Sequence, residues 1–242
     1  MVAVSVGTVV PGVVLTRPEW LAERISDMGI SWGTGDTRVS GTLWWCMAAS
    51  SVIDPVVVAA VAGRPGPDTV LEHLRCEIRP DGGVERVFAD AAAVGDGRPH
   101  VHDVEQPDDA GARHCTESCC AGIDSDNADS SAVHLRETLA RIIPVVAEVS
   151  GASVASLWAI VADAIGNRAI DAGDAEAGAR LARQVAGRLP VPRFADIGAR
   201  TFVRRISCCL VFEVPNCQMC TSCPKRPAAE RQELLSALTA GG

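Results

Sequence analysis

Cysteine is the residue type whose spacing in this chain points most directly to chemistry. The sequence of 242 residues contains ten cysteines, and five lie close to its end: Cys208, Cys209, Cys217, Cys220 and Cys223. Thiolates are soft ligands, and four of them suit either zinc or an iron–sulfur cluster. In a reducing compartment such clustering indicates metal binding or redox work rather than structural disulfides. The residues alone therefore predict a thiolate metal site near the end of the chain.

The two cysteine pairs make different demands on the backbone. Cys220 and Cys223 are separated by two residues, so a tight turn can bring both sulfurs to one side of a metal ion. Cys208 and Cys209 are adjacent, and on a regular strand their side chains would point to opposite faces. If both bind one cluster, the backbone must bend or bulge there, or the two sulfurs must reach different irons.

The complete spacing is Cys-Cys, ten residues, Cys, two residues, Cys, and it resembles the C-terminal signature of the FhuF-like ferric-siderophore reductase family. The resemblance implies a 2Fe–2S cluster bound by Cys208, Cys209, Cys220 and Cys223. It is tight over about residues 200–226 and looser at the paired aromatic positions Trp44-Trp45 and Leu157-Trp158. Arg204-Arg205 before the cysteine pair and the apolar segment ending at Pro215 also look like the family.

The resemblance further implies an enzyme that reduces the iron of a ferric siderophore by one-electron transfer and releases ferrous iron in the cytoplasm. Its partners would be the ferric siderophore and an unidentified electron donor. Hard oxygen donors hold iron(III) tightly and iron(II) weakly, so reduction alone would release the metal. No catalytic residue beyond the cluster is needed, which agrees with the lack of a convincing nucleophile–base arrangement in the sequence.

Two departures from the family pattern leave alternatives open. Thr221-Ser222 stands inside the final cysteine pair, where the family usually has Gly-Asp or similar. Cys217 is an extra cysteine and a possible alternative ligand, because Cys217-x-x-Cys220-x-x-Cys223-Pro224 partly resembles a bacterial ferredoxin run. A non-enzymatic iron–sulfur carrier or sensor, and a zinc-stabilised structural or interaction domain, are the other functions that these residues allow.

Charge separates the end of the chain from the rest. The net charge is −8 and the isoelectric point about 5.1, which disfavours nucleic-acid binding. From residue 200 onward six bases outnumber three acids. Cations stabilise an anionic cluster, and they also attract an anionic substrate or an acidic electron donor. The candidate docking residues are Arg200, Arg204 and Arg205, and an ordinary solvated basic face is the alternative.

The sequence also predicts a cytoplasmic protein without an integral membrane segment. The most apolar stretches, Val2–Leu15 and Val52–Ala62, are shorter than a spanning helix needs. No Lys or Arg precedes the first apolar run, so it makes a poor signal peptide.

The elements predicted around the cysteines are mostly helical, which gives an α+β fold. Helices are expected at residues 18–30, twice within 39–62 with a break at Asp54-Pro55, at 132–149 with a kink or break at Pro144, at 154–165, from the N-cap Asp174, and at 228–238. Residues 70–78 and 84–89 flank Asp81-Gly82-Gly83 and predict a β-hairpin. The apolar stretch 202–214 is β-like, so a short cysteine-bearing β segment is expected near the end.

Four segments follow from this pattern: N-terminal helices and hairpin (1–89), an acidic loop or insert (90–130), a helical region (131–199) and the cluster-binding segment (200–242). The insert carries ten acids against two bases. It also holds Cys115, Cys119 and Cys120 beside His114, which predict either a second metal site or unligated loop thiols. Cys46, Cys76 and the pair Trp44-Trp45 are expected in the core.

Overall fold

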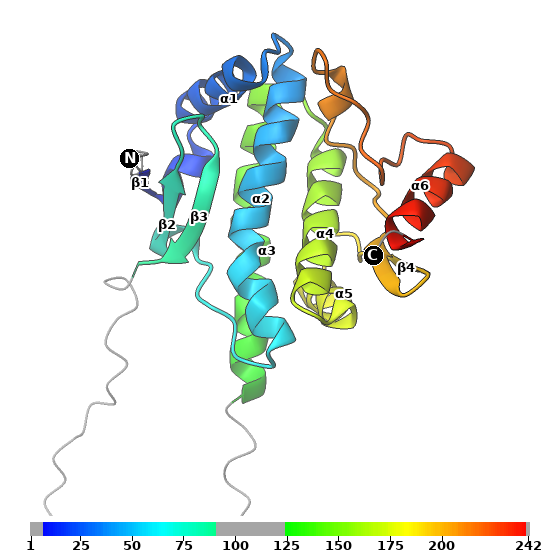
Figure 1. The fold of residues 1–242 in the computed structure, drawn as a ribbon. Helices are drawn as coiled ribbons and strands as arrows, with labels where there is room; N and C mark the ends of the chain where they lie inside the picture. The colour runs from blue at the N-terminus through cyan, green and yellow to red at the C-terminus, as the bar shows by residue number, and fades with distance from the viewer. Residues whose placement is uncertain (1–6, 91–123, 241–242) are drawn as a thin grey trace, which may run out of the picture.

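The computed structural model describes residues 7–90 and 124–240 and confirms a predominantly helical α+β fold (Figure 1). Its helices are α1 (Pro18–Trp32), α2 (Thr37–Val61), α3 (Asp124–Ser150), α4 (Val154–Asp171), α5 (Ala175–Val185) and α6 (Ala228–Ala240). An antiparallel sheet has the order β1 (Thr8–Pro11), β2 (Leu74–Ile78), β3 (Val84–Ala89), and a second pairs β4 (Phe194–Ile197) with β5 (Arg200–Val203). Short 3-10 turns are η1 (Gly12–Thr16), η2 (Leu71–His73) and η3 (Val211–Glu213).

Helix α2 is the element around which the others are arranged. It packs against α1, α3, α4, α5 and strand β3, and Figure 1 shows it in the middle of the fold, with the hairpin on one side and the C-terminal segment on the other. Trp44 and Trp45 are fully buried, which confirms their predicted place in the core. The Trp44 indole N–H donates to the Gly82 carbonyl and that of Trp45 to the Leu157 carbonyl, each at 2.9 Å. The two indoles thus join α2 to the hairpin turn and to α4.

The predicted break at Asp54-Pro55 is wrong, because α2 runs through Pro55 without interruption. A proline inside a helix removes one backbone hydrogen bond and costs about 3 kcal/mol. Val52, Ile53, Val56 and Val57 around it are almost completely buried, and each apolar side chain buried this way gains roughly 1.5–3 kcal/mol. Packing on several sides therefore outweighs the local penalty.

Helix α3 is likewise continuous through Pro144, and it begins at Asp124, inside the segment predicted to be a loop. Its side chains Leu139, Ile142 and Ile143 are fully buried around the proline. Residues 91–123 of the predicted insert, including Cys115, Cys119, Cys120 and His114, lie outside the described residues.

By length and composition α2 also qualifies as a helix that could cross a membrane, although half of its most apolar window is buried inside the protein. The central helix of a globular core meets the same two criteria. In this fold its apolar side chains contact other elements of the chain, including α1, α4 and β3.

Local signals in the sequence locate their elements correctly. The Asp81 carboxylate accepts a hydrogen bond from the Gly83 amide at 2.9 Å, and Gly82 adopts a φ of 80°, so the predicted hairpin turn is confirmed. The Asp174 carboxylate accepts from the Ala177 amide at 3.0 Å, which confirms the predicted N-cap.

The prediction of a β segment over residues 202–214 is wrong. Strand β5 ends at Val203, residues 204–210 form no helix or strand, and η3 follows. Strand β5 pairs with β4, and β4 was not predicted. Strand β1 was not predicted either, since its partner β2 lies more than sixty residues away in the sequence.

The crossing of α2 and α3 depends on a small residue. A Cβ added at Gly41 would lie 2.3 Å from the Ser150 Cβ, whereas a Cβ at Gly35 would meet no atom within 4 Å. We expect Gly41→Ala to destabilise the protein by roughly 1–3 kcal/mol because the helices must separate. We expect Gly35→Ala, the matched control, to change stability by less than about 1 kcal/mol. Urea unfolding of both variants checks this, and equal stabilities would contradict the tight crossing.

Candidate metal centre

The segment that carries Cys208 and Cys209 is held by a buried carboxylate instead of a neighbouring strand. Asp163 on α4 is only 3% exposed. Its carboxylate accepts hydrogen bonds from the Ile206 amide at 3.1 and 3.2 Å, from the Ser207 amide at 2.9 Å and from the Ser207 hydroxyl at 2.6 Å. These bonds satisfy the backbone donors that leave the sheet after Val203, so the chain can depart from strand geometry just before the cysteine pair.

A glycine one helical turn away lets the chain approach α4. Gly166 lies three residues after Asp163, on the same face of the helix. A Cβ at Gly166 would lie 2.9 Å from a Val203 methyl group and 3.1 Å from the Pro192 Cβ. The absence of a side chain there lets β5 lie close to α4 and brings the following residues within reach of Asp163.

The backbone turns sharply directly after the cysteine pair. Leu210 adopts a φ of 63°, in the left-handed region that side chains other than glycine rarely occupy, and this costs about 1–2 kcal/mol. The Leu210 amide lies against the Cys208 sulfur, where its hydrogen bond favours the thiolate. The bend predicted for two adjacent cysteine ligands is therefore present.

The second cysteine loop is held by arginine side chains that bind its carbonyl groups. The Cys223 amide donates to the Cys220 carbonyl at 3.1 Å, which forms the tight turn between these two cysteines. Arg226 donates to the Met219 carbonyl at 2.5 Å and to the Cys220 carbonyl at 3.0 Å. Arg231 on α6 donates to the Cys223 carbonyl at 3.3 Å. The predicted C-terminal helix thus fixes the shape of the loop.

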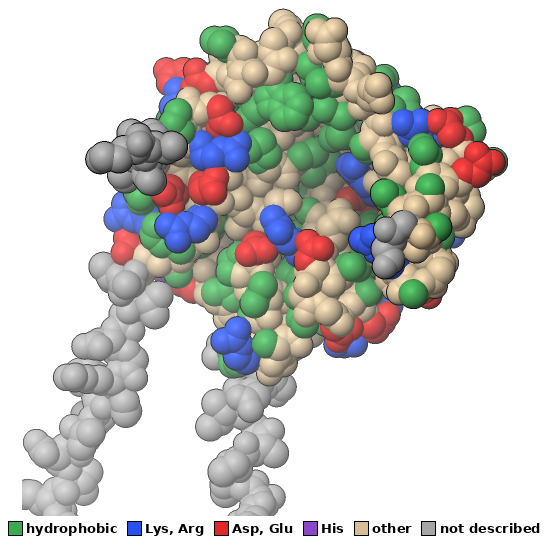
Figure 2. Space-filling model, viewed as in Figure 1, with side chains coloured by type: hydrophobic (Ala, Val, Ile, Leu, Met, Phe, Trp, Pro, Cys, Tyr) green, Lys and Arg blue, Asp and Glu red, His purple; other side chains and the backbone are tan. Residues whose placement is uncertain are grey.

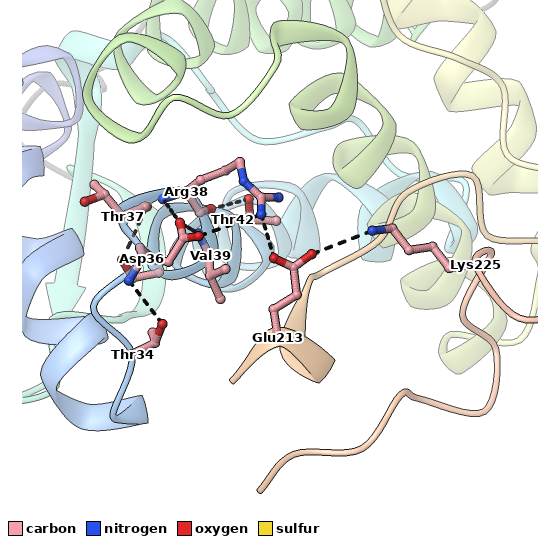
Figure 3. A network of polar contacts seen from close by, with 9 residues as sticks. Thr34, Asp36, Thr37, Arg38, Val39, Thr42, Glu213 and Lys225 are labelled. Atoms are coloured by element: carbon pink, nitrogen blue, oxygen red, sulfur yellow. Dashed lines mark hydrogen bonds and ion pairs between the residues drawn. The ribbon is translucent and has the colours of Figure 1, made fainter. Parts of the chain in front are cut away.

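An ion-pair network attaches this segment to the start of α2 (Figure 3). Glu213 in η3 accepts from Arg38 at 2.6 Å and lies 3.7 Å from the Lys225 ammonium group. The Lys225 ammonium group also stands 4.8 Å from the centre of the Phe212 ring. Asp36 caps the same end of α2 by accepting from the Arg38 and Val39 amides.

The fold brings the two predicted cysteine pairs together. The Cys208 and Cys223 sulfurs lie 3.7 Å apart. Two thiolates, each about 2.3 Å from one tetrahedral metal, would be separated by about 3.8 Å, so this pair fits a shared ion. Cys209 and Cys223 are both close enough to the Cys220 sulfur to help raise the pKa of that thiol.

Burial raises the pKa of two of these thiols, Cys208 and Cys220, and so favours their protonated form. It raises the pKa of Cys208 to about 11, and it also raises the pKa of Cys220, against which the positive charge of Arg205 acts. A metal that binds here must displace protons, and its positive charge would compensate the thiolates.

Cys46 of α2, which the sequence predicts as a core residue, also lies near the C-terminal cysteines. Burial raises the pKa of the Cys46 thiol to about 12, and the nearby Cys209 is the second largest cause. Its proximity to Cys209 could not be read from the sequence, because more than 160 residues separate them. Cys76 is buried in the core as predicted.

Cys217 has surroundings like those of the cysteine pair, since Cys208 and Cys209 also pack against the hydrophobic core. Its amide donates to the Val214 carbonyl at 3.1 Å, and its side chain packs against the hydrophobic core. Within the described residues no hydrogen bond joins its sulfur to Cys208, Cys209, Cys220 or Cys223. The four-cysteine ligand set therefore stays a prediction from the spacing and the resemblance, with Cys217 as the alternative ligand.

The three candidate docking arginines also differ in position. Arg200 and Arg204 are exposed, and the Arg200 guanidinium stands 5.5 Å from the Phe202 ring centre. The Arg205 side chain is only 17% exposed and points inward, with one guanidinium nitrogen 3.6 Å from the Cys220 sulfur. Arg205 thus lies against a cysteine sulfur and a buried carboxylate, whereas Arg200 and Arg204 face solvent as a docking role requires.

The five cavities described for this fold lie away from the C-terminal cysteines. Their volumes are about 280–490 Å³, and they are lined by residues of other regions. Figure 2 shows instead that the face between the hairpin and the C-terminal segment is hollowed, with hydrophobic side chains gathered in its upper part.

The structure shows a helical α+β protein whose C-terminal segment brings cysteine sulfurs near one another, although among the described residues no three His, Cys, Asp or Glu side chains form a ready metal-binding group. Residues 205–225 match the family model of the FhuF 2Fe–2S C-terminal domain, which confirms the predicted resemblance over the segment that holds all five cysteines. The match supports a protein related to iron–sulfur and siderophore-iron chemistry. No curated protein and no solved structure matches the chain.

The ligand set can be tested by single cysteine replacements. We expect Cys217→Ser to leave the visible and EPR spectra of a 2Fe–2S protein intact, because Cys217 lies outside the Cys-Cys, ten residues, Cys, two residues, Cys spacing that resembles the family signature. We expect Cys220→Ser, in the same loop, to lose most of the bound iron and sulfide. Anaerobic purification with iron and sulfide assays provides the measurement. Loss of the cluster from Cys217→Ser would show that the ligand set is wrong.

Proposed function

We propose that the protein binds a 2Fe–2S cluster through Cys208, Cys209, Cys220 and Cys223 and reduces the iron of ferric siderophores in the cytoplasm. The single observation that carries this proposal is the family match across a segment whose cysteines also converge in space. The enzyme class, a ferric-iron reductase, rests on the family.

The chain's own residues would hold and surround this group. Asp163 fixes the bend before Cys208, and Arg226 fixes the loop around Cys220. Cys208, Cys209 and Val211 pack against the hydrophobic core, which limits the access of water. A cluster bound there supplies one electron at a time.

The substrate step needs little more than electron delivery. An external electron donor gives one electron, and the chelated iron(III) becomes iron(II), which hard oxygen donors bind weakly. The hollowed face in Figure 2 offers an open surface for a bulky chelate. The exposed Arg200 and Arg204 would attract an anionic chelate or an acidic donor, as long-range charge does at other docking sites.

A zinc-stabilised domain is the alternative from a different class. Zinc in a structural site is surrounded by four ligands at the corners of a tetrahedron. Among the residues that the structure describes, no three His, Cys, Asp or Glu side chains form such a group. The match to the model of a 2Fe–2S domain is what favours an iron–sulfur cluster over zinc on these cysteines.

Metal analysis decides between these two candidates. We expect the full chain, purified without oxygen, to be coloured, to contain about two irons and two sulfides per chain, and to give an EPR signal after reduction. A colourless protein that holds stoichiometric zinc would exclude the redox function.

Turnover distinguishes a reductase from a passive carrier. We expect the reduced protein to transfer electrons to anionic ferric chelates, and the double variant Arg200→Gln/Arg204→Gln to slow this roughly three- to tenfold at low ionic strength with its iron content unchanged. Arg17→Gln/Arg64→Gln removes the same charge from exposed positions elsewhere and is the matched control. Stopped-flow oxidation of the reduced protein measures the rate. A rate no higher than that of an unrelated 2Fe–2S protein would favour the carrier.

A further inference from the structure

Arg205 is a buried cation whose contacts are directed at the metal centre. Its Nε lies 3.5 Å from an Asp163 carboxylate oxygen and has no hydrogen-bond partner among the described residues. Its Nη1 lies 3.6 Å from the Cys220 sulfur, within hydrogen-bonding distance for sulfur. One guanidinium therefore joins a buried carboxylate to a thiol.

The carboxylate does not need Arg205 to satisfy its hydrogen bonds. Asp163 already accepts from the Ile206 and Ser207 amides and from the Ser207 hydroxyl. A buried ion pair is a weak source of stability, because desolvation offsets much of the attraction. The position of Arg205 is thus poorly explained by stability alone.

The sulfur contact has a clear meaning once Cys220 is a thiolate. A neutral thiol is a weak acceptor, whereas hydrogen bonds from a cation to an anion are short and strong. Hydrogen bonds to the sulfurs and nearby charge set the reduction potential of iron–sulfur centres, and a positive donor favours the reduced, more negative state. The guanidinium is therefore placed where it affects the cluster's potential.

From these contacts we infer that Arg205 raises the reduction potential of the cluster by donating a hydrogen bond to the Cys220 thiolate, and that Asp163 is the positioning residue that holds this guanidinium in place. The inference rests on the cluster of the proposed function, although not on the reduction of ferric siderophores. It assigns to Arg205 a role within the centre in place of the docking role predicted from sequence.

The test compares Arg205→Gln with Arg204→Gln in the full chain, since these adjacent positions undergo the same change of charge but only Arg205 is buried against the sulfur. We expect Arg205→Gln to keep its iron and sulfide, to shift the midpoint potential to a more negative value and to change the EPR g-values of the reduced cluster. We expect Arg204→Gln to leave both unchanged, because an exposed charge is screened. The midpoint potential of Arg205→Lys, which keeps a cation, should lie between those of Arg205→Gln and the unaltered protein.

Equal potentials in Arg205→Gln and Arg204→Gln would overturn the inference. Loss of the cluster from both Arg205→Gln and Arg205→Lys would also overturn it, since Arg205 would then serve assembly. Iron and sulfide contents of the unaltered protein test the cluster itself, so a failure of the proposed function is recognised separately.

Asp163→Asn tests the positioning role through the sign of the shift. If Asp163 acted only as a nearby negative charge, its neutralisation would raise the potential. If Asp163 positions Arg205, the midpoint potential of Asp163→Asn should fall as it does in Arg205→Gln. The midpoint potential of the double variant Asp163→Asn/Arg205→Gln should then be no lower than that of Arg205→Gln alone. A rise of the potential, or full additivity in the double variant, would contradict the positioning role.

Discussion

The cysteine centre depends on one buried carboxylate. Two adjacent cysteines cannot serve one metal centre from a regular strand, because successive side chains point to opposite faces. The chain must therefore leave the sheet before Cys208, and the amides that it frees need other acceptors inside the protein. Asp163 supplies them, since its two oxygens bind the Ile206 and Ser207 amides and the Ser207 hydroxyl.

This constraint explains several features of the elements nearby. Helix α4 must present Asp163 toward the C-terminal segment, and Gly166 on the same face removes the side chain that would hold β5 away. Helix α4 is itself fixed against α2 through the hydrogen bond from Trp45 to the Leu157 carbonyl. Arg38 at the start of α2 binds Glu213 beyond the cysteine pair (Figure 3). Helix α2 thus holds the cysteine-bearing segment in two ways, through α4 before the cysteine pair and through Glu213 after it.

The sequence allowed correct prediction where the determining contacts are local. The hairpin follows from Asp81-Gly82-Gly83 and the start of α5 from Asp174, because these residues bind backbone within a few positions of themselves. The prediction of strand over residues 202–214 failed because the apolar residues there resemble a strand, while the partner that determines the backbone lies on α4, about forty residues earlier. The break predicted at Pro55 failed for a similar reason, since only the surrounding core keeps that helix continuous.

The centre itself was predictable in part. Spacing and family resemblance single out Cys208, Cys209, Cys220 and Cys223, and the fold adds that the Cys208 and Cys223 sulfurs lie 3.7 Å apart. The counting of basic residues grouped Arg205 with Arg200 and Arg204, yet only Arg205 is turned inward. Composition reports how many charges a segment carries, and burial determines which of them act at short range, where the low dielectric strengthens each interaction. Because a buried ion pair contributes little to stability, the arginine that contacts both Asp163 and a cysteine sulfur is better explained by the chemistry of that sulfur than by the folding of the chain.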